Sequence, residues 1–260
     1  MQLNYSNDPL IGAEGGLADS GNNDILTYNN PVQAIPAGRA LFKIIGDDDG
    51  VKLPDADAVA RVVGVAVRTI AMESDADGNI VYPPKSAISG IRKGRIYVKV
   101  EEAVTPDDAV FVRFGGKQQV QTITFSANFV ALNKINMNIN GEPISEVTFD
   151  TDQATTMTAL DAAITAMEGV ANVATAGTVV TITSEQDVDI DITDILVTLG
   201  VSQATSIVAE TVVGRSLADR GSFRKTADSG TAFELLNAKW TNTGAGALAG
   251  DIAVLDINLP

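Results

Sequence analysis

The stretch Tyr82–Phe114, YPPKSAISGIRKGRIYVKVEEAVTPDDAVFVRF, carries several strand and turn signals in one run. Within it, Arg95–Val100 alternates polar and apolar side chains with the period of two that is typical of a half-buried strand. Ile88–Ile91 is predicted to be a shorter strand, and Arg92–Gly94 a tight turn between the two. The stretch therefore predicts antiparallel strands at the centre of a β-rich core.

Further strands are predicted on both sides of this pair. Thr105–Asp108 combines Pro with two Asp residues, which favours a type I turn, and the alternation resumes over Ala109–Phe114 to complete a meander. Upstream, Ala40–Ile45 is a strand, and Val59–Ile70 is a second one with apolar residues on both faces. A strand that is apolar on both faces is expected in the middle of a sheet. The chain ends on a dense apolar strand, Ile252–Leu259.

These residues carry a family resemblance. Tyr82–Phe114, the preceding strand Val62–Thr69 and the chain end GDIAVLDINLP resemble the structural cement, or capsid decoration, proteins of tailed bacteriophages. The resemblance covers Met1 to about Lys117 and about Val213 to Pro260. It implies a β-rich, non-enzymatic protein that assembles as a homotrimer on the outside of a virion capsid, with the major capsid protein as its partner. No catalytic residue and no cofactor come with it.

The composition excludes several classes of protein independently. The 260-residue chain has neither Cys nor His, which removes disulfide frameworks, thiol nucleophiles, the usual zinc sites and Ser-His-Asp triads. No run of eighteen apolar residues is present, and the start lacks a basic segment followed by an apolar one. We therefore expect neither a membrane span nor a signal peptide, and synthesis in the host cytoplasm.

Charge is distributed unevenly along the chain. The net charge of −15 argues against a nucleic-acid partner, because phosphates would be repelled. Residues 118–212 contain twelve acidic residues and a single basic one, Lys134, and carry −11 of this charge. We therefore predict a near-neutral core domain formed by residues 37–117 and 213–260, suited to protein contacts. We predict that the acidic residues 118–212 form an inserted domain that is exposed to solvent.

Residues 1–36 are rich in Asn, Asp, Gly and Pro and show no sustained apolar period. They are expected to form no element of the core. One interpretation is a poorly ordered terminus; the other, which we favour, is an extended arm that orders against a neighbouring subunit. The residues predicted to contact the capsid or another subunit are Tyr5, Pro9, Leu10, Ile11, Tyr28, Arg92 and Arg95.

Two acidic turns in the sequence lack the complete ligand spacing of a calcium-binding loop. Glu73, Asp75 and Asp77 fit the first ligand positions of an EF-hand loop, but Pro84 stands where the bidentate Glu must be. Asp47–Gly50 has no later acidic partner at loop spacing. Hairpin turns are therefore favoured over weak cation sites at both places, and no metal site is predicted.

A third acidic group, Asp187, Asp189 and Asp191, alternates with aliphatic residues. This pattern predicts a strand over Val188–Ile192 with its carboxylates on one face. A solvated strand face is favoured over a calcium site, because neighbouring carboxylates on one face repel each other and no neutral oxygen ligands lie nearby in the sequence.

The acidic stretch reads as a compact α+β module, one helix on a small sheet. Asp152 or Thr155 caps the helix, and Gly169 ends it. Its apolar stripe consists of Met157, Leu160, Ile164 and Met167. The expected strands are Thr122–Phe125, Lys134–Asn140, Val147–Phe149, Val170–Val173, Val179–Ile182, Val188–Ile192 and Ile207–Val213, with a hairpin turn at Asn140–Gly141. The module is similar to modules spliced into assorted phage virion proteins.

The prediction is thus a mainly β protein, with a discontinuous β-sandwich or barrel-like core domain and an inserted small α+β domain. The function it favours is that of a structural cement protein bridging neighbouring capsomers. An alternative is a tail or baseplate protein with the insert as a receptor-facing module. A bacterial surface-binding protein is disfavoured by the missing export signal. An enzyme acting through two carboxylates is disfavoured because no pair stands out from its surroundings.

Overall fold

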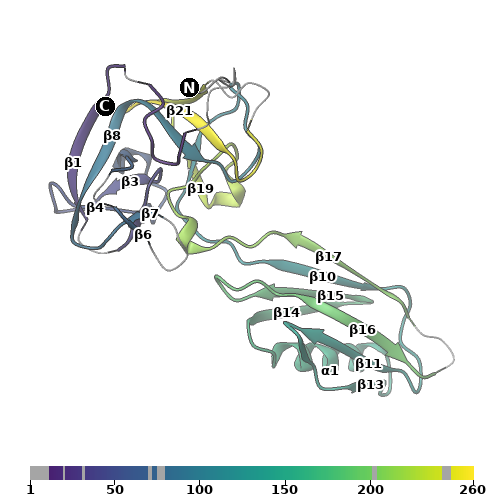
Figure 1. Ribbon diagram of the computed structural model, residues 1–260. Coiled ribbons are helices and arrows are strands. Elements are labelled where there is room, and N and C mark those ends of the chain that lie inside the picture. The colour runs from purple at the N-terminus through teal and green to yellow at the C-terminus, as the bar shows by residue number, and fades with distance from the viewer. Residues whose placement is uncertain are drawn as a thin grey trace, which may run out of the picture. The chain divides into compact units, whose positions relative to one another are not determined.

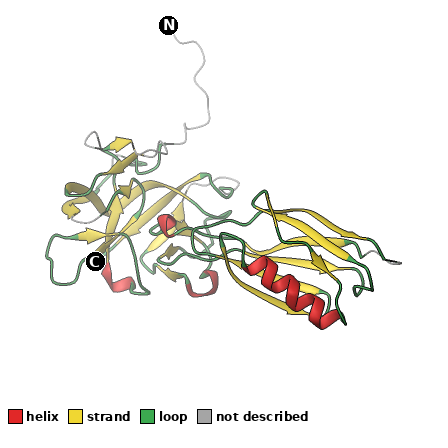
Figure 2. Ribbon diagram, turned by 90° about the horizontal axis from the view of Figure 1, so that it is seen from below, coloured by secondary structure: helices red, strands yellow, loops and turns green. Residues whose placement is uncertain are grey.

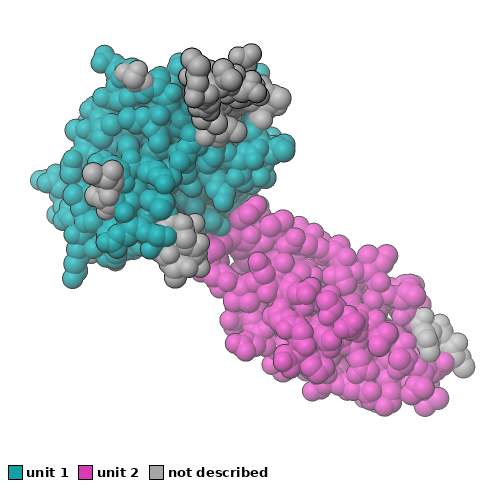
Figure 3. All heavy atoms as spheres, in the orientation of Figure 1, with its two compact units in different colours: residues 1–115, 219–260 teal, residues 116–218 magenta. Residues whose placement is uncertain are grey.

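The computed structural model describes residues 12–19, 21–30, 33–69, 72–74, 80–200, 204–241 and 247–260. The chain divides into two compact units, shown in different colours in Figure 3. The first, which we call the core unit, comprises Met1–Gly115 and Asp219–Pro260, and the second, the insert, comprises Gly116–Ala218. Strands dominate both units, and the described residues contain one α-helix. The prediction of a mainly β protein with a single helix is confirmed.

Three sheets build the core unit (Figure 1). Its strands are β1 (Asp24–Asn30), β2 (Ile35–Pro36), β3 (Ala40–Lys43), β4 (Val51–Lys52), β5 (Val62–Ala66), β6 (Glu73–Ser74), β7 (Ile80–Tyr82), β8 (Ser86–Lys99), β9 (Phe111–Arg113), β18 (Phe223–Arg224), β19 (Ala232–Glu234), β20 (Ala238–Thr241) and β21 (Ile252–Asn258). The largest sheet runs β20-β21-β8-β5-β3-β4, with β1 also paired to β8. Two three-stranded sheets, β18-β9-β19 and β2-β7-β6, accompany it.

Strand β8 is the element around which the large sheet is organised. It runs unbroken for 14 residues, so the turn predicted at Arg92–Gly94 is wrong. Its first half pairs with β1 and β5, and its second half pairs with β21. Gly94 has a positive φ of 128°, and a Cβ at this position would collide with the side-chain oxygen of Asn23. Glycine here therefore lets the N-terminal segment pass close to a continuous strand, instead of turning the chain.

The predicted meander is also wrong, because β8 and β9 belong to different sheets. The turn between them is confirmed: the Asp108 N–H donates to the Thr105 carbonyl at 3.1 Å, and the Thr105 N–H donates to the Asp108 carboxylate at 2.7 Å. The central position predicted for the Val59–Ile70 strand is confirmed by β5, which lies between β3 and β8. A short 3-10 turn, Val59–Arg61, occupies its predicted start.

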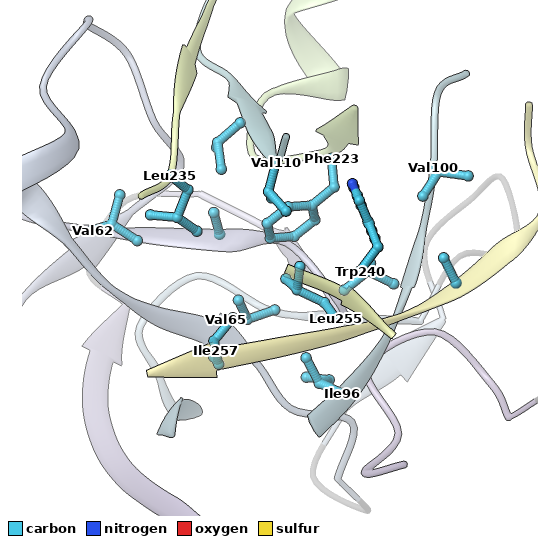
Figure 4. Close-up of a cluster of buried hydrophobic side chains, with 14 of the residues drawn as sticks. Val62, Val65, Ile96, Val100, Val110, Phe223, Leu235, Trp240, Leu255 and Ile257 are labelled. Atoms are coloured by element: carbon cyan, nitrogen blue, oxygen red, sulfur yellow. The ribbon is translucent and has the colours of Figure 1, made fainter. Parts of the chain in front are cut away.

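The main apolar cluster of the core unit lies between strands that are distant in sequence (Figure 4). Trp240 is buried at its centre, where its ring meets Phe223 edge-on at 6.5 Å between centroids. The Trp240 indole N–H donates to the Ala109 carbonyl at 3.2 Å, which satisfies its one polar group. Leu255 and Ile257 of β21 are also fully buried in this cluster.

The N-terminal segment is bonded to the sheet already before β1. The Gly15 N–H donates to the Tyr97 carbonyl at 2.7 Å, and the Tyr97 N–H donates to the Gly16 carbonyl at 2.8 Å. Downstream, β1 pairs with β8 along its whole length. The expectation that residues 1–36 form no core element is therefore wrong for β1, and also for β2, whose Ile35 is fully buried. Five of the seven β1 side chains are exposed, so the strand is held largely by backbone pairing and leaves no apolar period to detect.

The insert contains two four-stranded sheets, where one small sheet was expected. Their strands are β10 (Val120–Phe125), β11 (Lys134–Ile139), β12 (Glu142–Pro143), β13 (Val147–Thr148), β14 (Val170–Ala176), β15 (Val179–Ser184), β16 (Ile192–Thr198) and β17 (Ser206–Val212). One sheet runs β14-β15-β10-β17, and the other runs β12-β11-β13 with β16 also on β11. Both contribute side chains to one shared apolar cluster.

The single helix, α1 (Gln153–Thr165), completes the insert (Figure 2). Asp152, one of the two residues predicted to cap the helix, is the N-cap. Its carboxylate accepts a hydrogen bond from the Thr155 N–H at 2.8 Å. The predicted stripe is confirmed: Met157, Leu160 and Ile164 are buried in the cluster, and Met167 packs against it. The hairpin turn predicted at Asn140–Gly141 is also confirmed, since both residues have positive φ and β11 pairs with β12.

The strand predicted over Val188–Ile192 is wrong, because β16 begins only at Ile192. Asp189 and Asp191 are exposed and Ile190 is buried, so the alternation is present without ladder pairing. Period-two burial alone does not distinguish an extended loop from a strand. Hydrogen-bonded partners do, and β11 supplies them only from Ile192 onward.

Candidate functional site

The predicted interface residues of the N-terminal segment fall into two groups. Tyr5, Pro9, Leu10 and Ile11 lie outside the described residues. Tyr28 lies on β1, where its hydroxyl donates to the Val63 carbonyl at 2.9 Å and its ring packs against a core cluster. Burial raises the pKa of the Tyr28 hydroxyl above its ordinary value.

The other two predicted residues, Arg92 and Arg95, lie on β8. The charge of Arg92 acts on the Tyr28 hydroxyl and opposes the rise in its pKa, so the structure brings these two residues together. Arg95 is exposed and pairs with Asp19 at 3.7 Å and Asp256 at 3.5 Å. These ion pairs join segments near the two chain ends, but exposed pairs contribute little stability.

The most exposed strand of the core unit's large sheet is β1. Ile25 and Leu26 are 40% and 38% exposed, although both belong to a strand that is fully paired on β8. Because successive side chains of a strand point to opposite faces, Ile25 and Leu26 are exposed on the two faces of β1, next to a register shift between Asp24 and Ile25. We call the exposed residues Asp24, Ile25, Leu26 and Thr27 the β1 surface.

A buried ion cluster lies where the core unit is interrupted by the insert. Arg113, two residues before Gly115, holds Glu101 with two hydrogen bonds of 2.7 Å and Asp228 with one of 2.5 Å. Arg224 bonds the same two carboxylates at 2.8 Å each. The Arg113 side chain is fully buried and the other three are at most 12% exposed. Two positive and two negative charges thus balance inside the protein.

This cluster joins the two sequence segments that flank the insert. Arg113 belongs to β9 and Arg224 to β18, and these strands pair with each other. Burial alone would raise the pKa of Glu101, but hydrogen bonds from Arg113 and Ser222 and the charges of both arginines hold that pKa below its ordinary value. Burial would lower the pKa of Arg113, but its two carboxylate partners raise it. The side chains of the cluster therefore stay charged, and their ion pairs help to hold β9 and β18 together.

Sequence reasoning missed the cluster. Its members are separated by up to 127 positions. In the sequence, each one looks like an ordinary solvent-exposed charged residue. The one available signal was the scarcity of charge elsewhere in the strands that carry them, since Val112 and Phe223 beside them are apolar and buried.

Carboxylates of the acidic turns accept hydrogen bonds from backbone N–H groups. The Asp47 carboxylate accepts the N–H groups of Asp49 at 3.1 Å and Gly50 at 2.9 Å, which closes the predicted turn. Asp187 accepts the Leu217 N–H at 2.6 Å. Of the predicted loop at Glu73–Asp77, residues 75–77 lie outside the described residues. In the described part of the chain, no three acidic side chains gather as a metal site would require. No helix among these described residues is long and apolar enough to cross a membrane.

The family model for structural cement proteins (E217 gp24/Pam3 gp6) matches residues 1–184. The chain belongs to this family. The predicted resemblance is confirmed, with a different extent: the match continues past Lys117 to Ser184 in β15, and it does not include residues 213–260. This cement protein is therefore a structural protein of a phage capsid.

Solved structures of phage proteins are similar to this cement protein at low identity. A chain from the capsid of Myoviridae phage XM1 is 11% identical with a TM-score of 0.45, over 99% of this chain and 98% of that one. A chain from Mycobacterium phage Patience is 12% identical with a TM-score of 0.40, over 93% and 94%. No curated protein matches the chain.

Proposed function

We propose that this cement protein binds the outside of a bacteriophage head and bridges neighbouring copies of the major capsid protein. The observation that carries the proposal is the family match over residues 1–184. A cement protein works mechanically, since the free energy of many repeated contacts adds to the cohesion of a shell under pressure from packaged DNA. The chemistry needed is apolar area on a rigid surface.

The core unit supplies such a surface at β1. Ile25 and Leu26 are exposed on a strand that is held along its length by β8, so binding them requires little ordering. Tyr28, on the same strand, fixes β1 to the core through the hydrogen bond from its hydroxyl to the Val63 carbonyl. The insert carries most of the negative charge and is costlier to desolvate, so we assign head binding to the core unit.

Substituting Ile25 and Leu26 together by Glu is expected to weaken binding to heads at least about tenfold, because apolar contact is replaced by charges that must be desolvated. Co-sedimentation of the variant with heads that lack the protein measures this. Leu236→Glu is the matched control, because Leu236 is 74% exposed in the core unit away from β1. Equal loss of binding in both variants would remove β1 from the docking surface.

We also propose a homotrimer held by the core unit. Association through the acidic inserts alone would be opposed by charge repulsion. Light scattering on the purified chain at moderate salt is expected to give about three times the 27.1 kDa chain mass. A monodisperse species of the single-chain mass at micromolar concentration would contradict the trimer.

The insert is expected to be dispensable for head binding. The Gly221 N–H donates to the Arg113 carbonyl at 2.8 Å, so the two cut ends of the core unit lie side by side and a short Gly-Ser linker can replace Gly116–Ala218. The insert has its own apolar cluster and should fold alone with a cooperative melt. The linker variant should remain β-rich by circular dichroism and still bind heads. Loss of binding with the fold retained would place the insert in the docking surface.

A further inference from the structure

Strand β17 is an outer strand of the insert sheet β14-β15-β10-β17, and it carries exposed apolar side chains. Ile207 is 71% exposed and Val208 is 37% exposed. Within Ser206–Val212 the one charged residue is Glu210, although residues 118–212 together carry −11. An apolar outer strand is unexpected in so acidic a domain.

Outer strands β14, β4 and β20 each carry a feature that discourages edge pairing, whereas β17 over Ser206–Glu210 does not. Helix α1 packs against β14, which also has a bulge near its start. Strand β4 has only two residues, and β20 presents Lys239. Strand β17 pairs regularly with β10 from Ser206 to Glu210 and contains neither Lys nor Pro. An exposed apolar edge of this kind is a template for another strand.

The direction of the free backbone groups of β17 follows from its ladder with β10. The Ser126 N–H donates to the Thr205 carbonyl at 2.8 Å, whereas the Phe125 N–H points the other way, to Thr178 of the neighbouring hairpin. Hydrogen-bonded pairs alternate along an antiparallel ladder, so Ile207 directs its backbone groups to β10. Val208 and its neighbours two residues away, Ser206 and Glu210, direct theirs outward.

We propose that β17 pairs with β17 of a second copy of this chain, antiparallel and centred on Val208. The pairing joins two four-stranded sheets into one sheet of eight strands. In this register Val208 faces Val208, Ile207 faces Ala209, and Glu210 faces Ser206 of the second copy. The outward backbone groups then meet in hydrogen-bonded pairs. A register centred on Glu210 places two glutamates opposite each other and is disfavoured.

The charge distribution points to a second copy as the occupant. A basic partner would be drawn to the acidic parts of the insert, whereas this edge offers it a single carboxylate. On the sheet face that Ile207 shares, the paired positions of β10 and β15 are also uncharged, among them Thr122, Thr124, Thr181 and Thr183. Two copies therefore meet edge to edge with Glu210 as the one charge on each paired strand. Repulsion between the two acidic inserts still weakens the pairing and is reduced by salt.

The paired segment is short, about 17 Å for five residues, and covers far less than the roughly 800 Å² per partner of a stable interface. The pairing is therefore weak between free chains and strong between chains held close together. It does not depend on the proposed function. With the proposed trimer, a two-fold contact through the insert would link neighbouring trimers into a net.

Disulfide trapping tests the pairing, because the chain has no cysteine of its own. Val208→Cys places two thiols across a hydrogen-bonded pair with Cα atoms about 5.5 Å apart, within reach of a disulfide. The full-length variant is oxidised in solution at about 0.15 M salt, where charges more than about 8 Å apart are screened. The rate of dimer formation is read on a non-reducing gel.

Ala174→Cys is the matched control, because Ala174 is exposed on β14 at the opposite edge of the same sheet. We expect Val208→Cys to form the covalent dimer at least about tenfold faster than Ala174→Cys. Adding Ile207→Lys, at a position exposed enough to leave the fold intact, should return the rate to that of the control. The pairing is overturned if Val208→Cys reacts no faster than Ala174→Cys, or if Ile207→Lys leaves its rate unchanged.

Discussion

Replacing Glu101 by Gln is expected to lower the free energy of unfolding of the core unit by about 3–5 kcal/mol, the usual cost of breaking a buried ion pair from one side. Glu101 bonds both Arg113 and Arg224, so its loss leaves two buried guanidinium groups with one buried carboxylate, Asp228. The other remaining partner is the partly exposed Glu102, 3.4 Å from Arg224. Urea unfolding followed by Trp240 fluorescence reports on this unit, since Trp240 lies in its core and is the one Trp of the chain.

The control is Asp48→Asn, which removes a fully exposed carboxylate paired with Lys43 in the same unit. It should leave the urea midpoint unchanged within error. Similar midpoints for both variants would mean that the buried cluster contributes no more than a surface pair.

Glu101 also makes an acid-dependent contribution. Its folded-state pKa lies below the ordinary value of about 4.3, so the folded state binds its proton more weakly than the unfolded state does. The stabilisation is therefore complete above that ordinary value and is lost as pH falls through the lower, folded-state pKa. Below about pH 4.3 the stability of the Glu101→Gln variant should fall less steeply with pH than that of the natural protein.

Deleting residues 1–36 is expected to unfold the core unit or cost it on the order of 5 kcal/mol, a large part of the stability of a small domain. The deletion removes β1, which pairs with β8 over seven residues, and the bonds of Gly15 and Gly16 to Tyr97. It also exposes the core surface that Tyr28 covers. Thermal melts followed by near-ultraviolet circular dichroism measure the effect.

The matched control keeps the β1 backbone and changes only its exposed side chains, with Ile25→Ser and Leu26→Ser together. Because β1 is held by backbone pairing, this variant should melt close to the natural protein. An intact, equally stable core after deletion of residues 1–36 would return the segment to the role of a detachable arm.

Elements with one buried face could be predicted from the sequence. The α1 stripe at Met157, Leu160 and Ile164 is an example, because burial of one face leaves a period in the side chains. Strand β5 has no such period, and its position in the middle of the sheet was predicted from a run of apolar residues on both faces. Strand β1 left no period, since five of its seven side chains are exposed and only Tyr28 and Asn30 turn toward the protein. The sequence predicts a turn at Gly94 because a glycine needed for close approach looks the same in sequence as one needed for a bend.

The candidate site was less accessible to prediction. Arg113, Glu101 and Arg224 meet only through the pairing of β9 with β18 across the insert, and no local spacing encodes that meeting. The charge imbalance along the chain did mark the acidic stretch. It did not reveal that β17, inside this stretch, carries a single charged residue. Only the strand order shows that this apolar strand lies at an edge.

Cryo-electron microscopy of heads with and without the protein tests the central claim most directly. If this cement protein bridges neighbouring capsomers, heads that carry it will show additional density on their outer surface, connecting adjacent copies of the major capsid protein, and fitted by the core unit with β1 at the contact. Outer surfaces that are identical in the two preparations, or density confined to the tail, would contradict the account.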